Sequence, residues 1–83
     1  MKIRYFAWVR ERIGKPEEEI AVPAEVGTVA ELIKLLSARG EEYAYAFENP
    51  GVIRAALDRV HVKAQHKLTG ASEIAFFPPM TGG

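Results

Sequence analysis

The sequence predicts a small α+β fold in which a mixed sheet is covered on one face by one main helix. Three observations support this prediction: an alternating segment at the start of the chain, a capped amphipathic helix in the middle, and a second alternating segment near the end. The chain has 83 residues, of which 48% are hydrophobic and 27% charged, and this suits one globular domain. It has no cysteine, so no disulfide can support the core.

Residues 2–10 alternate in the way that is typical of a β-strand. One face would carry Ile3, Tyr5, Ala7 and Val9, and the other Lys2, Arg4, Phe6, Trp8 and Arg10. Gly14 and Pro16 then indicate a turn, and residues 18–22 provide a second short strand that Pro23 ends. The two strands are expected to pair as a hairpin.

The main helix is predicted to begin after Thr28. Thr28 and Glu31 fit a capping box, in which a hydroxyl and a carboxylate satisfy two free backbone amides. The apolar residues that follow have the spacing of one helical face: Val29, Leu32, Ile33 and Leu36. Arg39 and Gly40 suit the end of a helix, as a cation beside the dipole and as a left-handed cap.

The second half of the chain predicts short strands. Residues 41–48 favour a short helix or an irregular segment, which Asn49-Pro50-Gly51 would end. A loop is expected at residues 68–72, and strands are expected at residues 52–57, 60–62 and 73–77.

This order of elements favours a β-grasp (ubiquitin-like) arrangement, provided that the last strand returns parallel beside the first. One helix cannot cover both faces of a sheet, so it should lie across a single face. Residues 1–77 would form the β-grasp domain, and residues 78–83 would form a flexible C-terminal tail that ends in Gly-Gly.

Composition and motifs argue against several functions. Eleven Lys and Arg balance eleven Asp and Glu, which argues against nucleic-acid binding as the main activity. No apolar stretch approaches the ~20 residues that cross a bilayer, and no signal peptide is evident, so we expect a cytoplasmic protein without a membrane partner. With no cysteine and only His61 and His66, neither a metal nor another bound cofactor is expected. Ser37 and Ser72 lack a nucleophile motif, so we expect no catalytic activity of the chain on its own.

Basic and aromatic residues interleave near the N-terminus. They are Lys2, Arg4, Phe6, Trp8, Arg10, Arg12 and Lys15. Such a mixture suits a platform for single-stranded nucleic acid, and it is also typical of a sheet face that docks on a protein or of simple surface charge. The overall neutrality of the chain favours the last two over the nucleic-acid platform.

The C-terminal segment carries the chemistry. Pro78 and Pro79 cannot continue a strand ladder and stiffen the exit from the last strand. Gly82 and Gly83 have no side chain, so the backbone could enter a narrow slot. The reactive group would be the Gly83 carboxylate, which needs activation, and adenylation with ATP is the obvious route. Attack by a sulfur donor would then give a thiocarboxylate, and attack by a thiol and then a lysine would give protein conjugation; both routes stay open here.

Three segments resemble the MoaD family of ubiquitin-like sulfur carriers, the small subunits of molybdopterin synthase. They are residues 3–11, residues 28–32 and, most specifically, residues 73–83, and the likeness spans essentially all 83 residues. Asp58 stands where the family usually has Asn, and residues 69–72 replace an acidic turn. Neither departure touches the tail, so we expect altered turn energetics, altered partner contacts and retained function.

The resemblance implies a pathway for Gly83. An E1-like adenylating enzyme would use ATP to activate this residue, and a sulfur donor protein would convert it to a thiocarboxylate. The tail would insert into the large subunit of molybdopterin synthase, within a heterotetramer, and donate sulfur to cyclic pyranopterin monophosphate during molybdenum cofactor biosynthesis. A sulfur carrier for thiamine or tRNA thiolation, and a ubiquitin-like conjugation modifier, are the alternatives.

Partner binding is expected at the tail and at outward aromatic side chains. Phe76 and Phe77 point to opposite faces of the last strand, so one should be core and the other outward. The candidate contact residues are Phe6, Trp8, Phe76, Phe77, Pro78, Pro79, Met80 and Thr81.

Overall fold

The computed structural model describes residues 1–79. Its elements follow in the order β1 (Lys2–Tyr5), α1 (Ala7–Ile13), β2 (Glu17–Glu19), α2 (Val29–Ser37), α3 (Glu41–Ala46), η1 (Pro50–Val52, a 3₁₀ turn), β3 (Arg54–Leu57), β4 (Val60–Val62) and β5 (Glu73–Phe77).

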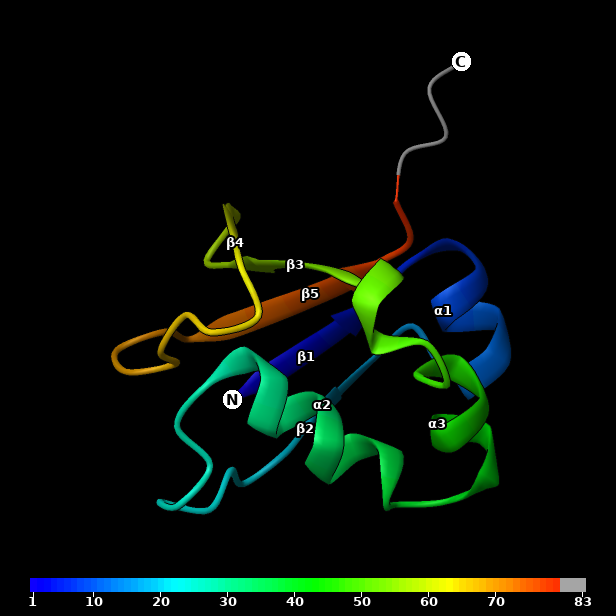
Figure 1. Ribbon diagram of the computed structural model, residues 1–83, viewed down its shortest axis with the longest axis horizontal. Coiled ribbons are helices and arrows are strands. Elements are labelled where there is room, and N and C mark those ends of the chain that lie inside the picture. Colours follow the sequence, from blue (N-terminus) through cyan, green and yellow to red (C-terminus); the bar gives the residue numbers. More distant parts are fainter. Residues whose placement is uncertain (80–83) are drawn as a thin grey trace.

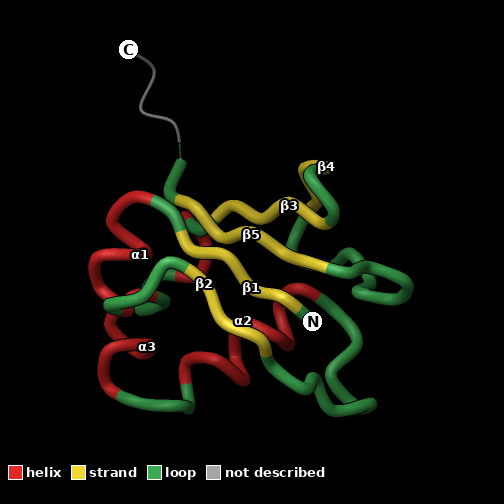
Figure 2. Tube along the Cα trace, turned by 180° about the vertical axis from the view of Figure 1, so that it is seen from behind, coloured by secondary structure: helices red, strands yellow, loops and turns green. Residues whose placement is uncertain are grey.

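The strands form one mixed five-stranded sheet in the order β2-β1-β5-β3-β4. β5 lies in the middle, parallel to β1 and antiparallel to β3. Figure 1 shows the helices in front of the sheet, and Figure 2, from the opposite side, shows the sheet in front of the helices. Within residues 1–79, the other face of the sheet carries no helix. The β-grasp prediction, with the last strand parallel to the first, is therefore confirmed.

The prediction of a strand over residues 2–10 is wrong beyond Tyr5. The chain turns at Ala7, whose φ is 52°, and continues as helix α1 up to a left-handed Gly14, whose amide donates to the Arg10 carbonyl at 2.8 Å. Val9 and Ile13 are four residues apart, and both are buried. One face of a helix can therefore bury these two side chains as well as one face of a strand can. The predicted pairing of the first two strands holds, although the connection is a helix and β2 covers only Glu17–Glu19.

Helix α2 begins as predicted and ends earlier. The Thr28 hydroxyl accepts from the Glu31 amide at 3.2 Å, and the Glu31 carboxylate accepts from the Thr28 amide at 3.0 Å, which is the capping box. The helix ends at Ser37, and Ala38 after it has right-handed backbone angles. Gly40 is not a left-handed cap: its backbone is extended, because it already forms the start of α3.

The predictions for the second half are confirmed with small shifts. Residues 41–48, for which a short helix or an irregular segment was expected, contain the short helix α3. β4 and β5 have the predicted bounds. β3 begins at Arg54, two residues late, because Pro50–Val52 form the turn η1. Asp58 and Arg59 join β3 to β4 with φ of 46° and 72°. Two successive left-handed residues are typical of a type I′ hairpin turn.

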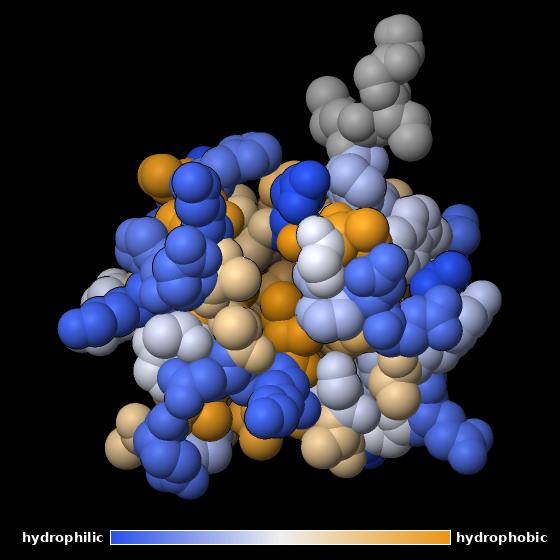
Figure 3. Space-filling view, viewed as in Figure 1, coloured by the Kyte–Doolittle hydropathy of each residue, from blue (hydrophilic) through white to orange (hydrophobic). Residues whose placement is uncertain are grey.

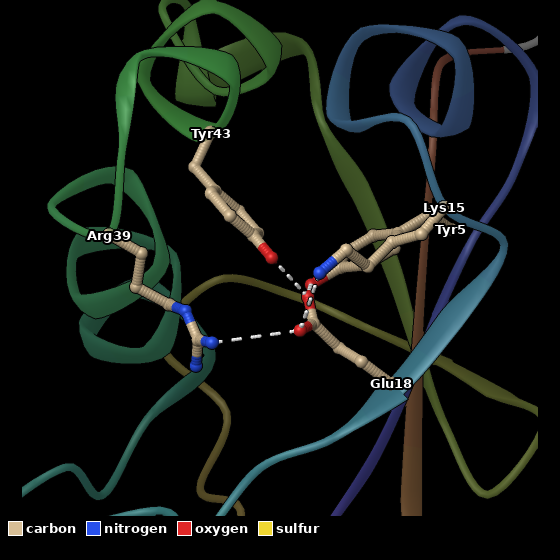
Figure 4. A network of polar contacts seen from close by, with 5 residues as sticks. All are labelled: Tyr5, Lys15, Glu18, Arg39 and Tyr43. Atoms are coloured by element: carbon tan, nitrogen blue, oxygen red, sulfur yellow. Dashed lines mark hydrogen bonds and ion pairs between the residues drawn. The ribbon is translucent and has the colours of Figure 1, made fainter.

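A polar network on Glu18 ties the first two strands to the helices (Figure 4). The hydroxyls of Tyr5 and Tyr43 both donate to Glu18 Oε2 at 2.7 Å, while Lys15 and Arg39 lie 3.4 and 3.7 Å from Oε1. Burial and the bond to Glu18 raise the pKa of Tyr5 well above its ordinary value. Partial burial of Glu18 opposes its ionisation, but the hydrogen bonds from Tyr43 and Tyr5 outweigh it and lower the pKa of this carboxyl.

Candidate functional site at the exit of the last strand

The exit of the chain from β5 is held on both sides. Phe76 pairs with Tyr5 of β1, and Phe77 pairs with Arg54 of β3. One residue beyond β1, the Phe6 amide donates to the Phe76 carbonyl at 3.0 Å. β5 therefore delivers the chain at a defined point at one end of the sheet, near α1 (Figure 1).

Pro78 and Pro79 follow directly and are half-buried. Neither has an amide hydrogen, so neither can donate to a strand ladder, and φ is restricted at both. The pair sets the direction of the chain after Phe77. Met80, Thr81, Gly82 and Gly83 lie outside the described residues, and the roles predicted for them stay predictions.

The sheet face without helices carries a cluster of aromatic and charged side chains next to this exit. Alternation along β1 and β5 turns Arg4 and Phe77 to this face. The Phe77 ring lies 5.2 Å from the imidazole of His61, and the Arg4 guanidinium lies 5.3 Å from the ring of Phe6, which is 38% exposed. We call Arg4, Phe6, His61 and Phe77 the exit face.

Small residues separate the aromatic side chains of the exit face. Ala75 pairs with Arg4 on one side and with Ala56 on the other, and Ala56 pairs in turn with His61. Ala75 and Ala56 contribute only methyl groups beside the half-buried Phe77, whose ring also contacts His61. A ring in that position can insert into an apolar pocket of a partner, and this is the usual geometry of an interface anchor.

The structure decides between the two adjacent phenylalanines. Phe76 is fully buried, with its ring stacked on Tyr5 at 6.5 Å and edge-on to Phe47 at 5.3 Å. The prediction that Phe76 contacts a partner is therefore wrong, because its side chain fills the core. The prediction that one of the pair is core and the other outward is confirmed, and Phe77 is the outward one.

Trp8 does not lie on the exit face. Helix α1 turns it towards α3, where it is half-buried and the Arg12 guanidinium lies 4.4 Å from its ring. The same guanidinium lies 4.1 Å from the ring of Tyr45 and donates to the Tyr45 carbonyl at 3.2 Å. Trp8 and Phe6 were predicted to share one surface, and the structure places them on two.

His61 is the exit-face residue that sequence reasoning missed. Its side chain reaches Phe77 because β4 pairs with β3, and β3 with β5. The pairing of His61 with Ala56 could have been predicted, because a hairpin centred on Asp58-Arg59 places these two residues opposite each other. The register of β3 against β5, which brings His61 close to Phe77, could not be predicted from local sequence.

The described residues contain neither a cluster of potential metal ligands nor a helix suited to a membrane. Between residues 1 and 79 no group of three or more His, Cys, Asp or Glu side chains is placed to hold a metal ion. In the same range, no helix has the length and apolar character to cross a membrane.

Comparison with known proteins agrees with the geometry. The ThiS family model matches residues 3–83. The molybdopterin synthase sulfur carrier subunit of Escherichia coli is 40% identical over 83 residues, and that of Haemophilus influenzae is 30% identical; each match covers 100% of this chain and 99% of the relative.

Solved structures agree as well. A Pyrococcus furiosus protein assigned as subunit 1 of molybdopterin converting factor superposes with a TM-score of 0.72 at 28% identity, covering 94% of each chain. SAMP1 of Haloferax volcanii gives the same TM-score at 21% identity, covering 100% of this chain and 98% of SAMP1, and shows the shared fold. Because the family match extends from the first strand to the last residue and both curated relatives align end to end, the chain belongs to the ThiS family, as the sequence resemblance to ubiquitin-like sulfur carriers predicted.

Proposed function

We propose that this chain is the sulfur carrier subunit of a molybdopterin synthase and that Gly83 carries the sulfur as a thiocarboxylate. The observation that supports this most is the extent of the match. The family model reaches residue 83, and the Escherichia coli sulfur carrier subunit aligns with the whole chain. The Gly-Gly end thus falls inside the matched region.

The chemistry starts from an unreactive group. A terminal carboxyl has a reference pKa of about 3.3–3.7, so Gly83 is ionised at neutral pH and is a poor electrophile. An E1-like enzyme would join it to the adenylyl group of ATP and release pyrophosphate. Sulfide-level sulfur supplied by a sulfur donor protein would then attack the carbonyl carbon and displace AMP, which leaves a thiocarboxylate.

Transfer would take place in the large subunit of the synthase. The thiocarboxylate sulfur would pass to cyclic pyranopterin monophosphate, and hydrolysis would return Gly83 to a carboxylate. In this scheme the carrier supplies a reactive terminus and a docking surface. ATP is consumed by the adenylating partner, and the carrier itself holds no cofactor.

The exit face supports such a role. Threading an extended tail into a partner costs about 1–2 kcal/mol for each residue that becomes ordered. A docking contact outside the tail has to offset this cost, and Phe6 and Phe77 lie beside the exit with their rings accessible. The same face would serve the large subunit and the adenylating enzyme in turn, since both must receive the same terminus.

Intact-protein mass after loading tests the proposal. The full chain is incubated with an E1-like adenylating enzyme, ATP and a sulfur donor, and the product is then added to the large subunit with cyclic pyranopterin monophosphate. We expect one oxygen to be replaced by sulfur, followed by loss of that sulfur to the pterin; a chain lacking Gly83 should do neither. High-mass adducts with lysines of other proteins would support a conjugation modifier instead. A loaded carrier that passes sulfur only to a thiamine precursor or to tRNA would place it in one of those routes.

A further inference from the structure

A groove opens on the helix-bearing side of the molecule, between α2 and the outermost strand β4. Its main part has a volume of about 920 Å³ and is lined by η1, the start of β3, β4 and the segment that follows β4. A second part of about 420 Å³ continues over α2 and shares Pro50, Gly51 and Ala64 with the first. Figure 3 shows apolar residues in the middle of this side, surrounded by hydrophilic ones.

The groove exists because the helices do not cover this edge of the sheet. Val60 and Val62 alternate with His61 and so share one side of β4. Val60 is 63% exposed, and Val62 is only partly buried against the core. The β4 edge therefore presents an aliphatic surface that no helix packs on.

The far wall of the groove is held in place by the backbone. The carbonyls of Ala64 and His66 accept from the amides of Ala30 and Val29 at 2.8 and 3.0 Å. The segment after β4 is thus attached to the start of α2, and the groove is formed before any ligand arrives.

Its rim is cationic. Lys34, Arg54 and Lys63 line the two parts, and among the described residues no Asp or Glu lines either of them. Within residues 1–79 none of these three cations forms an ion pair, whereas the ion pairs of the chain gather on other elements. A chain of zero net charge thus concentrates unneutralised positive charge around one apolar groove.

The edge of β4 adds backbone groups to this surface. β4 ends the strand order and pairs with β3 on one side only among the described strands. Free N–H and C=O groups of an edge strand can pair with an added extended segment. Aliphatic side chains, backbone donors and acceptors, and cations at the rim are all within reach of one ligand.

We propose that this groove binds an extended acidic segment of a partner protein, which adds as a strand along β4. Apolar side chains of the segment would pack on Val60 and Val62, and alternate carboxylates would lie near Lys63 and Lys34. Val60 and Val62 face the side of the sheet opposite Phe6 and Phe77, whereas His61 lines the groove and also contacts Phe77, so it belongs to both surfaces. The inference does not depend on the sulfur-carrier proposal.

Two other occupants fit less well. Single-stranded nucleic acid needs aromatic side chains on which bases stack, and of the residues in the described range no Phe, Tyr or Trp lines the groove. A second copy of this chain could present the acidic edge strand β2. However, Glu17 is paired with Lys2 at 3.1 Å and Glu19 with the N-terminal amine at 2.9 Å, so that edge is already neutralised.

Titration of the ¹⁵N-labelled full chain with a synthetic peptide tests the inference. The probe has about ten residues with alternating Val and Glu, and the comparison peptide has Lys in place of Glu. We expect chemical-shift changes confined to β4, η1 and the first turns of α2, and protection of β4 amides from hydrogen exchange. Lys63→Glu should weaken the acidic peptide at least tenfold, about 1.4 kcal/mol, and should strengthen the basic one. Arg10→Glu, which reverses an exposed cation on α1, is the matched control and should change neither.

A second variant separates apolar packing from charge. Val60→Ser removes an apolar contact at an exposed side chain without adding a charge, so it should fold normally and should weaken the acidic and the basic peptide by a similar factor, about threefold. The inference fails if the acidic and basic peptides bind equally, if the shifts fall on Phe6 and Phe77, or if an oligonucleotide displaces the acidic peptide. It also fails if the β4 shifts follow protein concentration without peptide, since the groove would then be a self-association surface.

Discussion

Two hydrogen bonds join Asp58 to the backbone of Glu73 at the end of the sheet opposite the exit of β5. The Asp58 carboxylate accepts from the Glu73 amide, with Oδ1 3.0 Å from the nitrogen, and the Asp58 amide donates to the Glu73 carbonyl at 3.0 Å. The same carboxylate accepts from the Ser72 amide at 3.0 Å. The two departures from the family pattern, Asp58 and the turn over residues 69–72, therefore meet in one contact.

Asp58→Ala should destabilise the fold by about 1–3 kcal/mol. The substitution removes the acceptor for two amides and places an alanine at a φ of 46°, where a short polar side chain is better tolerated. Asp58→Asn, which retains an acceptor oxygen and tolerates this conformation, should lose less than half as much. Urea unfolding measures both, and equal stability of the alanine variant and the native chain would show that the contact contributes nothing.

Glu18→Gln should destabilise the fold by about 1–3 kcal/mol at neutral pH, because the amide accepts the two tyrosine hydroxyls less well and pairs with neither Lys15 nor Arg39. The folded-state pKa of Glu18 is lowered, so its contribution is present above the ordinary pKa of glutamate, about 4.3, and is lost as the pH falls through the lower folded value. The difference between native chain and variant should therefore shrink on acidification. Glu25→Gln, at an exposed glutamate, serves as the control for removal of a surface carboxylate and should leave the stability at neutral pH nearly unchanged.

Ala7→Gly should stabilise the fold by up to about 1 kcal/mol. Ala7 has a φ of 52°, a conformation that costs an alanine about 1–2 kcal/mol and a glycine almost nothing. Ala44→Gly, at an exposed position inside α3, should change the melting temperature in the opposite direction, since glycine weakens a helix interior. Loss of stability in both variants would mean that the surroundings of Ala7 relieve the strain.

Phe77→Ala should weaken binding to the large subunit by at least about tenfold and leave the fold intact, because the Phe77 side chain lies on the exit face beside His61. Phe76→Ala, one residue earlier, should instead cost about 3–5 kcal/mol of stability because the side chain is fully buried. Calorimetric titration and thermal unfolding of both variants separate the two effects. Unchanged affinity of the Phe77 variant would remove the exit face from the docking proposal.

Removal of Gly83 should abolish thiocarboxylate formation without changing the melting temperature. The core of the described chain runs from Ile3 to Phe76, so the variant keeps every core residue of that range. Gly82→Val tests the narrow-slot hypothesis separately: it keeps the terminal carboxylate and adds a branched side chain, and it should slow loading strongly. Loading of the Gly82 variant at the native rate would show that the partner does not require a bare backbone there.

Elements whose signals are local were predicted correctly from sequence. The start of α2 depends on Thr28 and Glu31, three residues apart, and its buried face depends on spacing within the same helix. β5 was predicted from alternation over five residues, and it ends at Phe77 because Pro78 cannot extend a strand ladder.

Other features required contacts between distant segments. Whether residues 7–13 continue a strand or begin a helix depends on where Val9 and Ile13 find the core, since both patterns bury them. The choice between Phe76 and Phe77 depends on which side of the sheet the helices cover, and the contact of Phe77 with His61 depends on the register of three strands.

The amino-acid sequence by itself determined the β-grasp order of elements, the family and a chain end of two glycines behind two prolines, because caps, periods and proline geometry act within a few residues. Only the tertiary structure decided which phenylalanine faces outward, that Trp8 leaves the sheet face and that a cationic groove borders β4. Those outcomes depend on which side chains of the five-stranded sheet the helices cover and which they leave outward, and no short stretch of sequence contains that information.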